Sequence, residues 1–140
     1  MFASCRPNPW KIVLIFAYMA ALALVSVIPM DPGAAHIRFL VNMNPALQNV
    51  LHLPAYAALT ILWMQVLTQR GRHGLSRLCT ALLLGAGFGL ANEAMQILIP
   101  GRYPSLMDTL ANLAGSGLGV LVYIGVERRS PGTIRRLICT

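Results

Sequence analysis

Six polar residues interrupt stretches of the sequence that are otherwise apolar, and their side chains are of kinds used in acid–base chemistry and in binding polar ligands. They are His52, Tyr56, Glu93, Gln96, Asp108 and Asn112. Glu93 carries the most information, because a carboxyl group inside a membrane-spanning segment is costly and usually functional. A carboxyl group partly removed from water also suits proton transfer near neutral pH. Glu93, His52 and Asp108 are therefore the candidate catalytic residues.

The spacing of these residues predicts that they meet at one depth of a helical bundle. His52 and Tyr56 are four residues apart, and so are Asp108, Asn112 and Ser116 in turn. Residues with this spacing share one face of a helix. Two residues of the adjoining loop complete the predicted ligand-binding set, namely Arg102 and Ser105. We expect nothing comparable in the other half of the bundle.

Most of these residues also have a structural interpretation. Ser105 and Asp108 resemble a capping box that opens a helix. Asn112 and Gln96 could supply hydrogen bonds between helices, each worth about 0.6 to 2 kcal/mol. Tyr56 could be an aromatic residue of the membrane interface. None of these structural roles excludes a function.

The charged residues and the histidine have structural alternatives as well. Arg102 could be a loop cation that pairs with Asp108 or with a lipid phosphate. Glu93 could form a purely structural buried pair with Arg102 or His52. Taken alone, His52 is more typical of a capped or interfacial histidine than of a catalyst.

The composition identifies the kind of elements that must hold these side chains. Of 140 residues, 56% are hydrophobic and only 11% are charged, whereas soluble domains have about 25% charged residues. The mean hydropathy is +0.64. These values exclude an ordinary soluble enzyme, a disordered tail and a nucleic-acid-binding domain, and they indicate a membrane protein.

Four stretches are long and apolar enough to cross a bilayer, which takes about 20 residues in a helix. The predicted spans cover roughly residues 11–30, 50–68, 78–99 and 106–125. Asn8-Pro9 and Asn44-Pro45 each place a capping residue before a proline suited to the first helical position. Pro54 should kink the second helix or mark a later start, and Pro100-Gly101 should end the third.

The basic residues predict the orientation of the spans, because they favour the cytoplasmic side. Nine of the eleven fall on one side: Arg6, Lys11, Arg70, Arg72, Arg77, Arg128, Arg129, Arg135 and Arg136. Arg38 and Arg102 fall on the other side. The sequence thus predicts an all-α membrane protein, a single domain over residues 1–140 with four transmembrane helices and both termini cytoplasmic. The polar site then lies on the outer side.

Small residues predict how two of the helices pack. The third and fourth spans each carry a stripe with a spacing of four, made of Ala81, Gly85 and Gly89 and of Ala111, Gly115 and Gly119. Such stripes let helix backbones approach closely. We expect these two spans to form a close hairpin that turns Glu93 toward a helix contact.

The sequence shows no sign of a metal or a cofactor. Cys5, Cys79 and Cys139 all fall on the predicted cytoplasmic side, where a disulfide is not expected. Their spacing does not match a metal site, and no glycine-rich phosphate loop is present.

The polar pattern resembles the signature of the VanZ-like family of bacterial membrane proteins. Its motif E-x-x-Q, a short loop with R and S, and D-x-x-x-N-x-x-G is matched by Glu93, Gln96, Gly101, Arg102, Ser105, Asp108, Asn112 and Gly115. His52 and Tyr56 match a histidine and a tyrosine that open a helix in the family, and Ser26 and Pro29 match more weakly. An Asp-Lys pair that commonly precedes the histidine is replaced here by Gln48-Asn49.

The resemblance covers roughly residues 26–119 and implies a multi-pass protein of the bacterial cytoplasmic membrane that is linked to the cell envelope. The family's namesake is associated with low-level resistance to teicoplanin. Resemblance implies neither a particular reaction nor a resistance role for this chain.

Three functions remain open. The protein could bind or modulate an envelope lipid or lipid-linked glycan, with Arg102 on a phosphate and Glu93, Asp108 and Asn112 on sugar hydroxyls. It could be a small intramembrane enzyme acting on a lipid phosphate or a glycolipid, with His52 or Glu93 as general acid or base. It could also be a structural subunit whose small-residue stripes receive helices of another chain. No nucleic-acid partner and no cofactor are expected.

Overall fold

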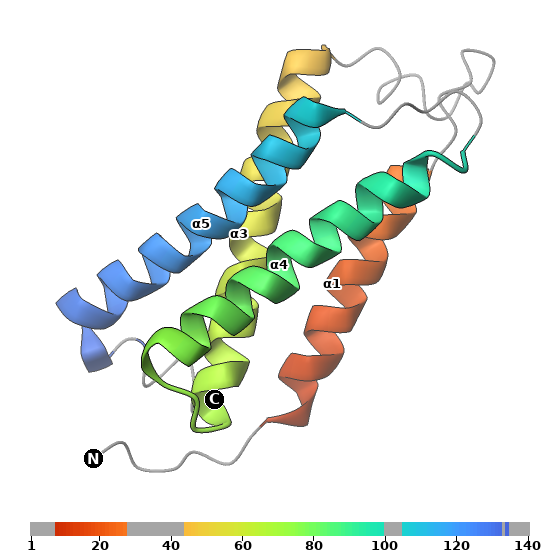
Figure 1. Ribbon diagram of the computed structural model, residues 1–140. Helices are drawn as coiled ribbons and strands as arrows, with labels where there is room; N and C mark the ends of the chain where they lie inside the picture. The colour runs from red at the N-terminus through yellow and green to blue at the C-terminus, as the bar shows by residue number, and fades with distance from the viewer. Residues whose placement is uncertain (1–7, 28–43, 100–104, 133, 135–140) are drawn as a thin grey trace.

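The computed structural model describes residues 8–27, 44–99, 105–132 and 134. Within these ranges the elements are four helices (Figure 1), and no strand occurs. The helices are α1 (Pro9–Val27), α3 (Pro45–Gln69), α4 (Gly74–Gln96) and α5 (Leu106–Arg129). All four are long and apolar enough to cross a membrane. The all-α class and the four predicted spans are therefore confirmed, and the chain is a multi-pass membrane protein.

The surface of the bundle is the kind that hydrocarbon requires. Large apolar side chains are exposed along every helix, among them Phe16, Leu51, Leu83 and Leu121. In water such a surface would be an aggregation hazard. Exposing apolar side chains to lipid tails has no such cost. In a membrane it is the polar residues that must lie inside the bundle, away from the lipid.

The helix starts follow the predicted caps. The side-chain oxygen of Asn8 accepts a hydrogen bond from the Trp10 N–H at 3.0 Å. The backbone carbonyl of Asn44 accepts one from the Leu47 N–H at 2.9 Å. Ser105 precedes α5, and its hydroxyl accepts a hydrogen bond from the Asp108 N–H at 3.4 Å. Each side chain or carbonyl satisfies one of the N–H groups that a helix leaves without an internal partner.

Several helix bounds differ from the prediction. Helix α3 begins at Pro45 and continues through Pro54, so Pro54 does not mark a later start, although the part apolar enough to span a membrane begins at Asn49. The third span ends at Gln96, before Pro100-Gly101, which lies outside the described residues. Beyond Gln96, the N–H groups of Leu98 and Ile99 donate to carbonyls three residues earlier, and this tighter pattern ends an α-helix.

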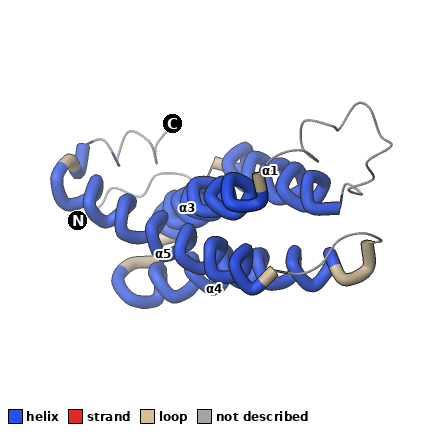
Figure 2. The backbone as a smooth tube through the Cα atoms, turned by 90° about the horizontal axis from the view of Figure 1, so that it is seen from above, coloured by secondary structure: helices blue, strands red, loops and turns tan. Residues whose placement is uncertain are grey.

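Helix α3 is the centre of the bundle, in contact with all three of the other helices. In Figure 1, α4 and α5 cross in front of α3, and Figure 2 shows the same layers from above. Helix α1 packs at the side against α3 and α4, and in the described part it does not contact α5. The polar residues of α3, α4 and α5 therefore share an interior that α1 closes on one side.

The glycine stripe of α5 packs against a different helix from the one predicted. A Cβ added at Gly115 would meet the backbone carbonyl of Leu53, and one at Gly119 would meet that of Ala57. Both carbonyls belong to α3, so the closest backbone approach is between α3 and α5. Helices α4 and α5 do contact each other, and Glu93 is turned toward the start of α5, as predicted. The predicted contact between the two matching stripes is wrong, because the stripe of α5 packs on α3. A spacing of four residues identifies the face of a helix that carries small residues, but it does not identify the helix that packs against that face.

The glycine stripe of α4 faces side chains instead. A Cβ at Gly85 would meet the hydroxyls of Thr60 and Ser116, and one at Gly89 would meet Asn112 and Tyr56. The stripe thus lies over the seam between α3 and α5. It makes room for polar side chains of both helices near the centre of the bundle.

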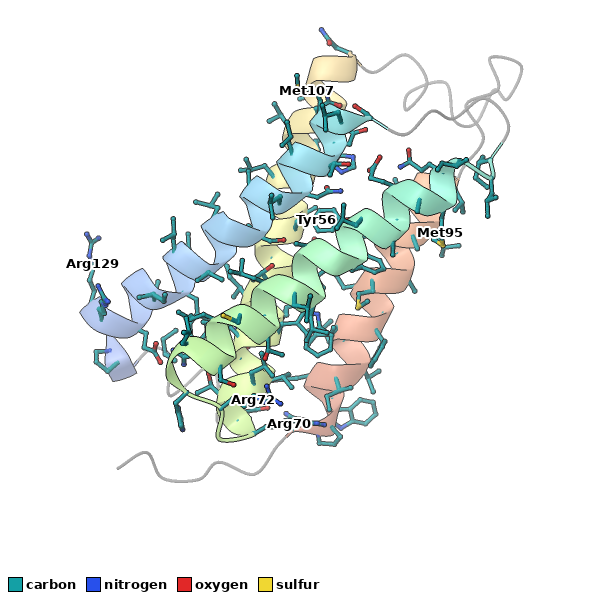
Figure 3. All side chains as sticks on the ribbon, in the orientation of Figure 1. Tyr56, Arg70, Arg72, Met95, Met107 and Arg129 are labelled. Carbon is teal, nitrogen blue, oxygen red and sulfur yellow. The ribbon has the colours of Figure 1, made fainter. Side chains whose placement is uncertain are left out.

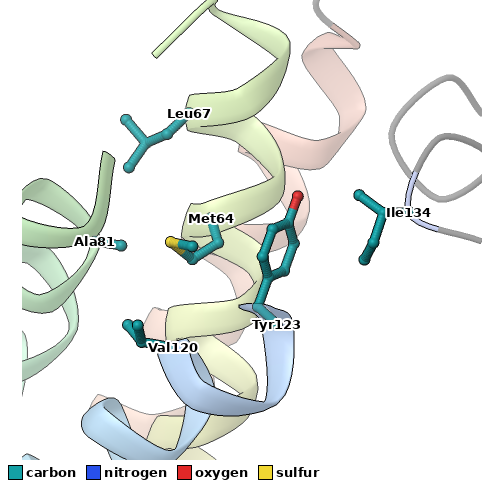
Figure 4. Close-up of a cluster of buried hydrophobic side chains, with 6 residues drawn as sticks. All are labelled: Met64, Leu67, Ala81, Val120, Tyr123 and Ile134. Carbon is teal, nitrogen blue, oxygen red and sulfur yellow. The ribbon is translucent and has the colours of Figure 1, made fainter. Parts of the chain in front are cut away.

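Three inward-facing stripes, each with a spacing of four residues, give the bundle its layers. They are His52, Tyr56, Thr60, Met64 and Thr68 on α3; Arg77, Ala81, Gly85, Gly89 and Glu93 on α4; and Asp108, Asn112, Ser116 and Val120 on α5. Met64, Ala81 and Val120 belong to one buried apolar cluster (Figure 4). This cluster separates the polar residues near the start of α5 from those near its end.

Candidate functional site

The candidate site lies at the end of the bundle where α3 and α5 begin and α4 ends, which we call the site end. His52 lies on α3, Glu93 in the last turn of α4 and Asp108 in the first turn of α5. These residues meet because α4 runs antiparallel to the other two helices (Figure 1). Figure 3 shows Tyr56 within the bundle just below this end, whereas Met107 and Met95 lie on its outside.

His52 is held by neighbours on two sides. Its Nδ1 lies 2.8 Å from Oδ1 of Asn112, and its Nε2 lies 4.0 Å from Oδ1 of Asp108. Its ring stacks on Tyr56, with centroids 6.2 Å apart and planes inclined by 7°. An amide oxygen at Nδ1 can only accept, so a proton on Nδ1 completes that hydrogen bond, while Nε2 faces the Asp108 carboxyl group. The ring is therefore fixed in orientation.

Glu93 is buried, with 4% of its surface exposed. Its Oε2 accepts a hydrogen bond from the backbone N–H of Ser105 at 3.3 Å. This N–H opens α5, so the Glu93 carboxylate takes a helix start on a neighbouring helix as its partner, which the positive end of the helix dipole favours. Its Oε1 has no hydrogen-bond partner among the described residues.

Asn112 lies between His52 and Glu93 and is 1% exposed. Its Oδ1 is used by His52, and its amide group interacts with the Glu93 carboxyl group. The contact falls short of a well-formed hydrogen bond, because neither Nδ2 of Asn112 nor Oε1 of Glu93 has a partner of good geometry in the described part. A donor and an acceptor thus stay open side by side in the buried site.

Among the described residues, one predicted residue is not joined to this group. Gln96 is buried on α4, but no side-chain hydrogen bond links it to the other site residues that the structure describes. Arg102 lies outside the described residues. Of the eight predicted ligand-binding residues, the structure brings together six, namely His52, Tyr56, Glu93, Ser105, Asp108 and Asn112.

The sequence reasoning missed Asn92 as part of the same region. Its Nδ2 donates to the Ser26 hydroxyl of α1 at 2.6 Å and lies 3.4 Å from the Tyr56 hydroxyl. Its Oδ1 is buried without a partner in the described part. An amide inside an apolar span indicates a hydrogen bond between helices or a polar site, so the sequence did contain a signal for Asn92. Asn92 and Ser26 connect α1 to the site.

A second polar cluster lies at the opposite end, where none was expected, and that expectation is wrong. Arg77 donates two parallel hydrogen bonds to Glu127, at 2.9 and 2.7 Å, and a third to Thr68 at 3.0 Å. The Thr68 hydroxyl lies 3.1 Å from that of Tyr123, and the guanidinium group lies 5.4 Å from the Tyr123 ring centroid. Arg77 was counted as a loop cation, but α4 begins at Gly74. The four extra residues place it inside the helix.

The site combines acid–base groups with open hydrogen-bonding atoms. Within the described ranges, no three His, Cys, Asp or Glu side chains lie so that they could hold a metal ion. Two carboxyl groups, one oriented imidazole and buried amides can hold a polar group and exchange protons with it.

The fold and the site define a helical membrane protein with a buried polar site at one end of its bundle. The family model VanZ/LLP1 matches residues 10–127, which cover all four described helices except Pro9 at the start of α1 and the last two residues of α5. The chain belongs to the VanZ/LLP1 family, as the resemblance of its polar motif implied. No curated protein and no solved structure matches the chain significantly.

Proposed function

We propose that the protein binds the polar head group of an envelope lipid or lipid-linked glycan at the site end, in the bacterial cytoplasmic membrane. The observation that carries the proposal is the pair of open buried atoms, Oε1 of Glu93 and Nδ2 of Asn112. Leaving a buried polar atom unpaired costs about 1–3 kcal/mol. A ligand that pairs with both atoms would recover that cost.

The same observation weighs against a purely structural site. A site that served only to join helices would pair its polar groups with one another. Here α4 and α5 contribute buried amide and carboxyl groups, yet Glu93, Asn112 and Asn92 each keep one atom without a partner among the described residues. Buried atoms without a partner also occur elsewhere in the described bundle, on Thr60, Trp63, Arg77 and Ser116, but at the site end they belong to neighbouring carboxyl and amide groups, which is what a polar ligand requires.

The distribution of basic residues supports placing the site on the outer side. Arg70, Arg72 and Arg129 lie at the end opposite the site (Figure 3). Basic residues favour the cytoplasmic side, so the site end would face outward, with both termini in the cytoplasm. In that orientation Arg102, in the loop that follows α4, is available to a lipid phosphate at the outer surface.

Native mass spectrometry of the purified protein tests the proposal by asking which lipids are retained. We expect wild type to keep a defined lipid that Asn112→Leu and Arg102→Ala lose, because the first removes the open donor and the second removes the cation. Thr109→Val, a neighbour of Asp108 that is not part of the site, should keep the lipid. Equal retention by all four proteins would overturn the proposal, provided that circular dichroism shows each to be folded.

One observation favours a second candidate, a small enzyme that acts on a lipid phosphate or a glycolipid. His52 is fixed through Nδ1, and its Nε2 faces Asp108 at 4.0 Å, which is how a general base is held for proton transfer. Glu93→Gln and His52→Gln should then abolish turnover of added lipid substrates while lipid binding persists. Full turnover by both variants would refute an enzymatic role for these residues.

A further inference from the structure

We infer that Asn92 is a positioning residue of the candidate site, which sets the orientation of His52 through Tyr56 and joins the site to α1. None of the binding residues predicted from the sequence lies on α1, so this role adds a fourth helix to the functional unit. The inference rests on the proposed function for what the site does, whereas the contacts that carry it are independent of any ligand.

Tyr56 is held by a single turn of α4. Its hydroxyl oxygen accepts a hydrogen bond from Nδ2 of Asn92 at 3.4 Å. Its ring packs on Phe88, with centroids 6.3 Å apart and planes inclined by 35°. A Cβ added at Gly89 would come within 3.1 Å of the same ring. Because Tyr56 is also 1% exposed, these three contacts leave its side chain little freedom to move.

The ring of Tyr56 in turn fixes the plane of the His52 ring. The two rings are stacked, with centroids 6.2 Å apart and planes inclined by only 7°. The polar contacts of His52 lie instead on α5, at Asn112 and Asp108. A ring held by a hydrogen bond at one nitrogen can still tilt about that bond, and a parallel ring against its face prevents the tilt. A functional side chain depends on such supporting residues for its geometry.

Asn92 is itself held by α1. Its Nδ2 donates to the Ser26 hydroxyl at 2.6 Å, and that hydroxyl donates its own proton to a carbonyl oxygen of α1 at 3.0 Å. An amide nitrogen carries two hydrogens, so Asn92 can serve Ser26 and Tyr56 at the same time. Tyr18 of α1 donates to the carbonyl of Ala55, the residue before Tyr56, at 3.1 Å. Helix α1 is therefore attached at two places beside Tyr56.

A residue that only attached α1 to the bundle would need one of these two hydrogens. The second hydrogen of Asn92 is directed at Tyr56, which already belongs to the site. Among the described residues, Asn92 has no hydrogen bond to His52, so any effect of Asn92 on that ring must pass through Tyr56. A positioning role therefore predicts a change at His52, whereas a purely structural role predicts a loss of stability alone.

Solid-state nuclear magnetic resonance of the full chain in lipid bilayers tests the inference. The histidines carry 15N, and His36 and His73 are replaced by glutamine, so that His52 gives the only imidazole signals. We expect one narrow pair of ring signals when Asn92 is present. Asn92→Leu and Tyr56→Phe should both shift and broaden the pair, because each removes the same hydrogen bond. Ser26→Ala should have a weaker effect, since Asn92 keeps its bond to Tyr56.

Arg77→Met is the matched control for stability. It removes a buried group at the opposite end of the bundle, so it should lower stability without moving the His52 signals. Native mass spectrometry gives the second measurement, on the lipids that co-purify with each protein. Asn92→Leu and Tyr56→Phe should each retain about fivefold less lipid than wild type, the effect of one hydrogen bond. The double variant should retain no less than either single variant.

The two measurements separate failure of the inference from failure of the proposed function. If the His52 signals of Asn92→Leu match those of wild type, the inference is wrong and Asn92 only links α1 to the bundle, whether or not lipid is bound. Additive losses of lipid in the double variant would also contradict it. If wild type retains no lipid but the signals respond as expected, the positioning role stands and the proposed function is wrong. If Asn92→Leu does not fold, Tyr56→Phe decides by the same signals.

Discussion

The ion pair between Arg77 and Glu127 should be a major source of stability at the end of the bundle opposite the site. Arg77 is 7% exposed, and both of its terminal nitrogens donate to Glu127, whose side chain is 25% exposed. Removing one partner of a fully buried pair costs about 3–5 kcal/mol. Because Glu127 retains access to its surroundings, we expect Glu127→Met to cost about 2–3 kcal/mol.

Removing Arg77 instead of Glu127 should cost less stability, and the variant that lacks both should reveal the energy of interaction between them. Arg77→Met leaves a carboxylate that can still reach the surface, so we expect a loss of about 1–2 kcal/mol. In the double variant neither charge is left alone. Its loss should be smaller than the sum of the single losses by about 1–2 kcal/mol.

The assay is reversible unfolding in mixed micelles, followed by circular dichroism for all three variants. Arg128→Gln is the matched control, since Arg128 is exposed one residue after Glu127, and it should change stability by less than about 0.5 kcal/mol. Additive losses in the double variant would refute the reasoning. A Glu127→Met variant as stable as Arg128→Gln would also refute the reasoning, because the ion pair would then contribute nothing to stability.

Two more predictions concern packing between helices. Gly115→Ala should lower the free energy of unfolding by about 1–3 kcal/mol, because its Cβ would meet the Leu53 carbonyl. Gly117→Ala, where a Cβ has open space, should be neutral or stabilise by up to about 1 kcal/mol. The same unfolding assay checks both, and equal effects would contradict the assigned α3–α5 contact. Ser26→Ala and Asn92→Ala should each cost about 1 kcal/mol, and their combination little more, since they share one hydrogen bond. Additivity in the double variant would show that this bond does not hold α1.

The helices could be predicted because the bilayer imposes simple rules. An uncharged stretch of about 20 apolar residues has few alternatives to a spanning helix. The exact ends depend on local hydrogen bonds instead. The start of α4 at Gly74 could not be read from hydropathy, since Arg72, His73 and Arg77 look like loop residues. Because α4 begins four residues earlier than predicted, Arg77 was assigned to a loop, and its buried ion pair with Glu127 was not predicted.

The residues of the site were easier to predict than their partners. Polar residues with a spacing of four had to share a face, and this reasoning placed His52, Asn112 and Glu93 together. It could not reveal that Ser105 gives its N–H to Glu93, or that the glycines of α5 pack on α3. Periodicity fixes the face of a helix, whereas the partner of that face depends on how three helices pack at once.

The two polar ends of the bundle differ in how their carboxylate groups are paired. At the end of α5, both carboxylate oxygens of Glu127 accept hydrogen bonds from Arg77. At its start, Glu93 is more deeply buried than Glu127, yet one of its oxygens is open. Hydrophobic layers separate the two ends, so neither can satisfy the other. If the degree of burial alone determined how completely a carboxylate is paired, Glu93 would be better paired than Glu127. The paired carboxylate of Glu127 therefore joins α5 to α4, although Nε of Arg77 is itself buried without a partner in the described part, and the open oxygen of Glu93 is the observation on which the proposed ligand site rests.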